Sequence, residues 1–361
     1  MSGIWIVAKK EFLDSVTSKK FILVLSLLLF IFAVAINEGI ERYNESLEYY
    51  KEEMMVTEEM PDGLPPRYPA FKPSILHIFL ALLYIFGRIG PILSIALGFD
   101  LVSGEKERGS LKSLLSHPVY RDEVINGKAI GGISAIVVAM LIVTSLSIGF
   151  LMMSGIVPDS DELLRILIFM GVSLLLMLSY FSVSLMSSTV AKNSTRAILY
   201  AIIVFFVLSY LVPMAGFFVS QQIVGDRPEH PAATMVFQVE DFNESSEGAL
   251  NKPPEIDIEA EERYQREIQE YYEEMQSIQD VFSALDPSSS YQKVSHSLIE
   301  PENDQSYGFY GGYMYEEGLI EEEITITESL QESWSGLVTL MVFPITMFAV
   351  AYIRFMRMDL R

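Results

Sequence analysis

The chain has 361 residues, half of them hydrophobic, yet 47 are acidic and the formal net charge is −22. Apolar and acidic residues must therefore be segregated along the chain, which favours membrane spans joined by polar segments. There is no Cys, which excludes disulfides, thiolate metal sites and Cys nucleophiles. The sequence also lacks HExxH, GxSxG and GxxxxGK[ST] patterns, so it predicts no catalytic residue, no metal site and no nucleotide-binding loop.

Residues 1–20 are predicted to form an elbow helix in the inner membrane interface. Trp5, Ala8 and Phe12 recur on one helical face, and Lys9 and Lys10 lie elsewhere. A cleaved signal peptide fits less well, because the apolar run starts only after this segment and no small-x-small site follows it.

Six apolar stretches are long enough to cross a bilayer. They are residues 21–36, 73–99, 129–157, 166–190, 197–224 and 334–353. Lys and Arg are in excess in one set of connecting segments, whereas the other set is strongly acidic, and the positive-inside rule assigns the basic set to the cytoplasm. The sequence therefore predicts an all-α, multi-pass protein of the cell membrane with both termini cytoplasmic.

The outer segments are predicted to form a largely helical, acidic ectodomain. They comprise residues 37–72 and the large acidic domain 225–333, whereas 354–361 form a cytoplasmic tail. From Tyr264 to Leu285, apolar residues recur every three or four positions, which is typical of a helix that packs on a partner helix. Two partners fit: the similar stripe from Ile40 to Met54, or a second copy of the same helix.

Arg88 is the only charged residue inside the six predicted spans. A cation at this depth costs about 2.5–3.5 kcal/mol on insertion scales, so it needs a partner. A backbone carbonyl freed by Pro91, the hydroxyl of Tyr84, water or an anionic group of a substrate would each serve. Arg88 is therefore a candidate for helix pairing or for substrate contact.

The cytoplasmic loop 100–128, between the second and third spans, carries the densest motif. Ser103 can cap a short helix, acidic residues suit its first turn, a leucine stripe follows, and Pro118 ends it. The motif consists of Asp100, Gly104, Glu105, Glu107, Arg108, Gly109, Ser110, Leu111, Leu114, Leu115, Pro118, Val119, Arg121, Gly127 and Lys128.

This pattern resembles the loop after the second span of ABC type-2 permeases, although Ser110 stands where Thr is commoner. The resemblance implies six transmembrane helices of the ABC type-2 exporter type, with this loop as the coupling helix that docks on a separate ATP-binding subunit. The docking residues it implies are Glu105, Glu107, Arg108, Gly109, Leu111, Leu114, Leu115, Pro118 and Arg121. ATP and Mg would be bound by the partner, and the chain itself would bind no cofactor.

Two functions stay open at this point. The resemblance implies the permease subunit of an ATP-driven exporter, which pairs with itself or with a similar permease in the lipid membrane. The alternative is a mechanotransducing subunit that acts on an extracytoplasmic protein without transporting a substrate. Neither reading makes the chain an enzyme or gives it a nucleic-acid partner, and the substrate is not encoded in any recognisable motif.

Overall fold

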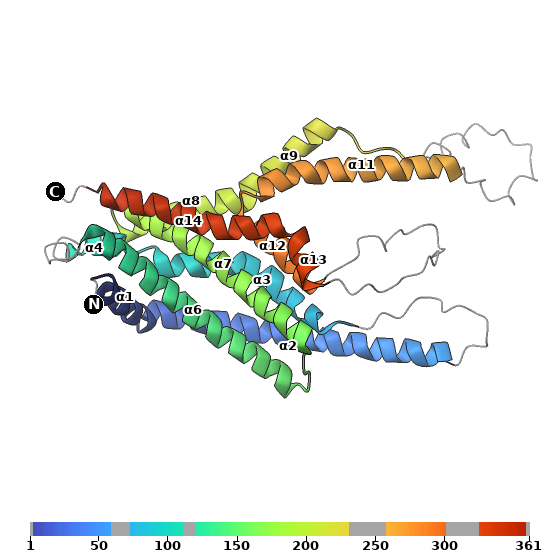
Figure 1. Ribbon diagram of the computed structural model, residues 1–361, viewed down its shortest axis with the longest axis horizontal. Helices are drawn as coiled ribbons and strands as arrows, with labels where there is room; N and C mark the ends of the chain where they lie inside the picture. Colours follow the sequence, from blue (N-terminus) through green and yellow to red (C-terminus); the bar gives the residue numbers. More distant parts are fainter. Residues whose placement is uncertain (1–2, 59–72, 111–119, 231–257, 301–324, 359–361) are drawn as a thin grey trace, which may run out of the picture. The chain divides into compact units, whose positions relative to one another are not determined.

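The computed structural model describes residues 3–58, 73–110, 120–230, 258–300 and 325–358 (Figure 1). Every regular element in these ranges is helical, which confirms the all-α prediction for them. The chain forms two compact units. Unit 1 comprises Met1–Ser209 with Pro287–Arg361, and unit 2 comprises Tyr210–Asp286.

Most helices belong to unit 1. They are α1 (Gly3–Val16), α2 (Lys19–Glu58), a 3-10 turn (Ile75–Phe79), α3 (Leu80–Gly98), α4 (Ser103–Glu107), α6 (Arg121–Met153), α7 (Ser160–Val190), α8 (Ser194–Phe206), α12 (Pro287–Ile299), α13 (Ile326–Glu332) and α14 (Trp334–Met356). Unit 2 contains α9 (Val212–Val224) and α11 (Ile258–Ser283). The π-helical turn Val207–Leu211 joins α8 to α9.

Six helical stretches of the described residues are long and apolar enough to cross a membrane, as predicted. They are Lys19–Glu52, Ile75–Glu107, Arg121–Met153, Ser160–Val190, Ser194–Val224 and Trp334–Met356. Their bounds differ from those predicted mainly at the first stretch, where α2 continues as one 40-residue helix. The fifth stretch is interrupted by the π-helical turn, because the ring of Pro213 clashes with the carbonyl four residues earlier and cannot continue a regular helix.

The core of unit 1 forms around α7, which packs against α3, α6, α8, α12 and α14 (Figure 1). Buried serines let these helices approach closely. The hydroxyl of Ser184 on α7 donates to the carbonyl of Ile95 on α3 at 2.9 Å. Phe79 and Phe169 meet edge to face with their ring centroids 6.0 Å apart. Small polar residues and interlocked aromatic rings thus fix the helix packing.

Helix α12 belongs to residues 225–333, which the sequence predicted to form the ectodomain. It packs in unit 1 against α3, α7 and α14, and Tyr291 is completely buried. The hydroxyl of Ser173 on α7 donates to that of Tyr291 at 3.2 Å. The Tyr180 hydroxyl lies 2.7 Å from that of Ser209 and 2.8 Å from that of Ser288. These hydroxyl contacts let a helix of low hydropathy enter the packed bundle.

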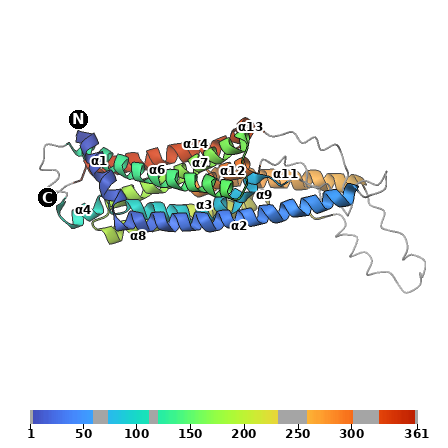
Figure 2. The ribbon, with the colours of Figure 1, turned by 90° about the horizontal axis from the view of Figure 1, so that it is seen from below.

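Helix α1 lies directly on α6 at two glycines. A Cβ added to Gly127 would lie 2.6 Å from the Cβ of Val7, and one added to Gly131 would lie 2.6 Å from the Cβ of Glu11. No larger residue fits at either position without separating the helices. The start of α1, helix α4 and the end of α14 lie at the same end of unit 1 in both views (Figures 1 and 2).

In unit 2, α11 packs along α9. Tyr264, Ile268 and Met275 of the predicted stripe are each only 9% exposed. The Gln279 side chain donates to the Ser220 hydroxyl at 3.3 Å. The sequence predicted a different partner for this stripe, either the stripe from Ile40 to Met54 or a second copy of the same helix. It did not predict α9, because those residues were interpreted only as part of the fifth span.

Candidate functional site

The candidate site is the connection between α3 and α6, centred on α4. Helix α3 ends at Gly98, and the chain turns so that the backbone N–H groups of Val102 and Ser103 both donate to the hydroxyl of Ser188, at 3.0 and 2.9 Å. Gly109 follows α4 with a φ of 71°, a left-handed conformation that favours glycine. The turn therefore fixes α4 against the end of α7.

Two charged side chains of α4 join the ends of α7 and α8. The ammonium of Lys106 donates to the carbonyls of Thr189 at 2.6 Å and Ala191 at 2.9 Å, at the C-terminal end of α7. The carboxylate of Glu107 accepts from the backbone N–H of Ser194, the first residue of α8, at 3.1 Å. Each charge has the sign that the helix dipole favours at that end. Helix α4 therefore bridges α7 and α8.

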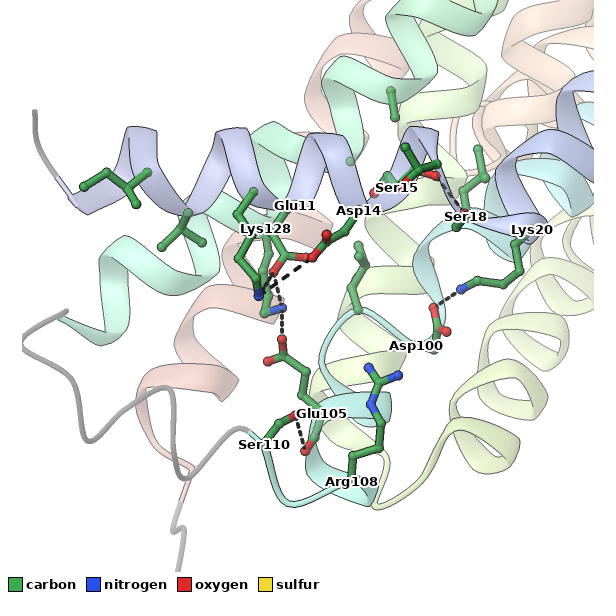
Figure 3. A pocket seen from close by; sticks show the side chains of 18 residues that line it. Glu11, Asp14, Ser15, Ser18, Lys20, Asp100, Glu105, Arg108, Ser110 and Lys128 are labelled. Carbon is green, nitrogen blue, oxygen red and sulfur yellow. Dashed lines mark hydrogen bonds and ion pairs between the residues drawn. The ribbon is translucent and has the colours of Figure 1, made fainter.

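Glu105 points in a different direction, into a buried ion cluster. The ammonium of Lys128 on α6 lies 2.8 Å from Glu105 and 2.9 Å from Glu11 on α1. Figure 3 shows Lys128 with these two carboxylates. Lys128 is completely buried, and Glu11 and Glu105 are 6% and 8% exposed. The cluster joins α1, α4 and α6 inside unit 1.

A cavity of about 890 Å³ adjoins this cluster. Its walls come from α1, the start of α2, the end of α3, α4 and α6, and they carry both charged and apolar side chains. The second carboxylate oxygen of Glu105, Oε2, is buried without a hydrogen-bond partner. A buried acceptor in that state is costly, so it marks a place where a donor would bind favourably.

The structure places the predicted docking residues in three different situations. Glu105 and Glu107 are engaged within the chain, and the guanidinium of Arg121 donates to the carbonyls of Met356 and Met358 near the end of α14, at 3.3 and 2.8 Å. Arg108 is exposed and makes no hydrogen bond or ion pair with a described residue. Leu111, Leu114, Leu115 and Pro118 lie outside the described residues.

Arg88 lies on an exposed face of α3, between Tyr84, which is 48% exposed, and Ile92, which is 51% exposed. Its guanidinium makes no hydrogen bond or ion pair within the described part of the chain. The structure therefore shows no bond to Tyr84 or to a carbonyl freed by Pro91, the two partners that the sequence offered within the chain.

Lys106, Lys128 and Glu11 were not among the residues predicted for the site. Their partners are distant in sequence: 117 residues separate Lys128 from Glu11. The sequence signal for Lys128 was its position directly after Gly127 in the motif. Because Gly127 packs against α1, the neighbouring Lys128 lies close to the helix contact and is buried.

The comparisons with known proteins agree with this architecture. A family model described as ABC-2 family transporter protein matches residues 5–360, which is nearly the whole chain. A comparison with curated proteins gave no match.

Proposed function

Because the chain belongs to the ABC-2 family of transporter proteins, we propose that it is the permease subunit of an ATP-driven exporter. A separate subunit would bind ATP and Mg and hydrolyse the nucleotide. The observation that carries this proposal is the anchoring of α4. Through Lys106, Glu107 and Glu105, this short helix contacts α7, α8 and α6, and the Lys128 ammonium links Glu105 to Glu11 on α1. A force applied next to α4 would reach four helices at once.

The docking surface is assigned to Leu111, Leu114 and Leu115, which follow α4 directly in the sequence. Leucines at this spacing would share one face of a helix, and such an apolar face would suit a groove on a partner protein. In this proposal Glu105 and Arg121 transmit the movement of the docked segment and do not touch the ATPase. The basic ends of the spans support a cytoplasmic location of α4 and of both termini in this proposal, on the side where ATP is available.

Co-purification tests the docking proposal. The double variant Leu114→Ser, Leu115→Ser should lose the ATP-binding subunit while the permease keeps its helical circular dichroism spectrum. The control is Leu285→Ser, which alters an exposed leucine of unit 2. Stoichiometric ATPase retained by the double variant would refute the assignment.

We further propose that two permeases assemble so that the exposed face of α3 is shielded from lipid. Arg88 stands 10 residues before Gly98, the last residue of α3, and 13 after Ile75, so it lies roughly 15–20 Å along the helix from either end. An unpaired cation at mid-depth cannot face hydrocarbon without a cost of about 2.5–3.5 kcal/mol. A water-filled pathway or a second copy would remove that cost, and an anionic substrate group could then reach the guanidinium.

Unit 2 supports the second candidate function, in which ATP hydrolysis drives mechanical work on an extracytoplasmic protein. Its helices α9 and α11 form a compact unit of their own, and α11 is strongly acidic. The two functions separate in sealed vesicles that contain the permease and its ATPase. Stimulation of ATP hydrolysis by a transported small molecule supports the exporter, whereas stimulation only by a bound outer protein supports the mechanical role.

A further inference from the structure

The cavity beside α4 contains two groups that no described residue satisfies. Glu105 and Arg108 both line the cavity: Oε2 of Glu105 is buried without a hydrogen-bond partner, and the guanidinium of Arg108 interacts only electrostatically, with Glu107, among the described residues. The first can accept a hydrogen bond and carries negative charge, whereas the second is a fork of positively charged donors. Oxygen atoms of a phosphate or carboxylate would match Arg108, and an ammonium would match Glu105.

The other charges of the cavity are already paired. Lys20 forms a short ion pair with Asp100, and Lys10 lies 3.8 Å from Asp14. The Lys128 ammonium is shared by the two buried carboxylates of the ion cluster. A simple anion or a simple cation would therefore satisfy only one of the two open groups, whereas a zwitterion would satisfy both.

The separation of the two groups suits a small zwitterion. Glu105 and Arg108 are three residues apart at the end of α4, and side chains at this spacing lie on the same side of a helix with Cβ atoms about 5–6 Å apart. A phosphate and an ammonium joined by two carbons span a comparable distance. Both residues are labelled beside the cavity in Figure 3.

The apolar wall of the cavity continues onto the surface of α1. Ile6 lines the cavity and is also 61% exposed, and Trp5 and Leu13 on the same helix are 63% and 49% exposed. An exposed apolar face with an aromatic residue is typical of a helix in the membrane interface. Acyl chains can lie along this face while their headgroup occupies the cavity.

We propose that this cavity binds a zwitterion with a primary ammonium and a phosphate, supplied as the headgroup of a phosphatidylethanolamine lipid. The ammonium donates to Oε2 of Glu105, and Arg108 donates to the phosphate. A choline headgroup is a poor ligand because its trimethylammonium has no N–H to donate. A glycerol headgroup lacks the cation altogether. The bound lipid fills the space between α1, α4 and α6 and adds a donor to the ion cluster.

Native mass spectrometry of the full chain, purified without the ATPase, tests this inference. The protein is delipidated and offered equimolar phosphatidylethanolamine, phosphatidylcholine and phosphatidylglycerol with identical acyl chains. We expect ethanolamine lipid to be retained roughly tenfold over the other two, the ratio that one charged hydrogen bond supports. Glu105→Gln should lower the retention of ethanolamine lipid to the level of the choline lipid, whereas Arg108→Gln should lower the retention of all three lipids, because each of them carries the phosphate. Arg196→Gln, an exposed arginine outside the cavity, should do neither.

Equal retention of the three lipids by the unaltered chain would overturn the proposal, and so would lipid retention that Arg108→Gln leaves unchanged. Since Arg108 is exposed, that variant remains informative even if Glu105→Gln does not fold. Addition of free phosphoethanolamine separates the two sources of the zwitterion. Displacement of the lipid by an equal concentration of the soluble compound supports the same site with a soluble ligand, and lack of displacement supports the lipid. Because no ATPase is present, failure of the docking proposal would not change any of these results.

Discussion

The buried ion cluster gives the sharpest stability prediction. Replacement of Lys128 by Met keeps the length and volume of the side chain but removes the ammonium that lies 2.9 Å from Glu11 and 2.8 Å from Glu105. Glu11 and Glu105, each less than 10% exposed, then lose the cation that they share, and Glu11 is left with the exposed ammonium of Lys10 at 3.9 Å. Loss of one partner from a buried ion pair costs about 3–5 kcal/mol. We expect Lys128→Met to destabilise unit 1 by about 4 kcal/mol.

The matched control is Lys10→Met. The side chain of Lys10 is 56% exposed and lies 3.8 Å from Asp14 and 3.9 Å from Glu11, so these long contacts of an exposed ammonium are worth about 0–1 kcal/mol. Thermal unfolding in lipid nanodiscs, followed by circular dichroism, compares the two variants. At roughly 2–4 °C for each kcal/mol, the scale for domains of about 150–250 residues, Lys128→Met should lower the midpoint by about 10 °C and Lys10→Met by about 4 °C at most.

A local measurement shows whether the cluster holds α1 on α6. Ala8 is 4% exposed on the buried face of α1, and the chain has no other cysteine to label. Ala8→Cys should be protected from maleimide in the unaltered background and reactive with Lys128→Met. If Glu105→Gln, added to Lys128→Met, partly restores the protection from maleimide, then uncompensated negative charge causes the loss of protection. Equal midpoints for Lys128→Met and Lys10→Met would refute the reasoning.

Three further predictions follow from the same structure. Gln276→Cys on α11 should react with an impermeant maleimide on intact cells, whereas Thr195→Cys at the start of α8 should react only after permeabilisation; the opposite pattern would invert the proposed orientation. Arg88→Gln should leave the melting temperature of the permease unchanged, because Arg88 has no partner among the described residues, but should abolish substrate-stimulated ATP hydrolysis while basal hydrolysis persists; equal loss of both activities would contradict the proposed substrate contact. Lys106→Met removes a charged donor from the carbonyls at the end of α7 and should cost about 1.5–3 kcal/mol in thermal unfolding, with exposed Lys192→Met as the control; identical midpoints for the two variants would argue against the cap.

The sequence alone determined the properties that depend on local composition. Apolar length identified all six candidate spans, because a helix that crosses a bilayer must satisfy its own backbone and present apolar side chains along its whole length. The family could also be predicted from the motif in residues 100–128, and the match over residues 5–360 confirms it. Such features can be predicted from the sequence because each depends only on residues that are neighbours along the chain.

Helix α12 shows what composition does not reveal about packing. Its low hydropathy placed it in a polar ectodomain, yet Tyr291, Val294 and Leu298 are completely buried in unit 1. Hydroxyl groups on α7 supply the partners that make this burial favourable, as Ser173 does for Tyr291. A sequence shows which residues are polar, but it does not show which of them will find a partner.

The charged residues of the candidate site show the same difference: the sequence identified several of them but not their partners. The sequence singled out Glu105, Glu107 and Arg121 as a group and gave them one role on a partner protein, whereas the fold gives each a different partner within the chain. In the sequence, Lys128 is one more basic residue at the inner end of a span. The fold places it beside Glu11, which is 117 positions away. A buried charge is stable only with its partner in place, and that partner is supplied by the packing of α1, α4 and α6, which no local pattern encodes.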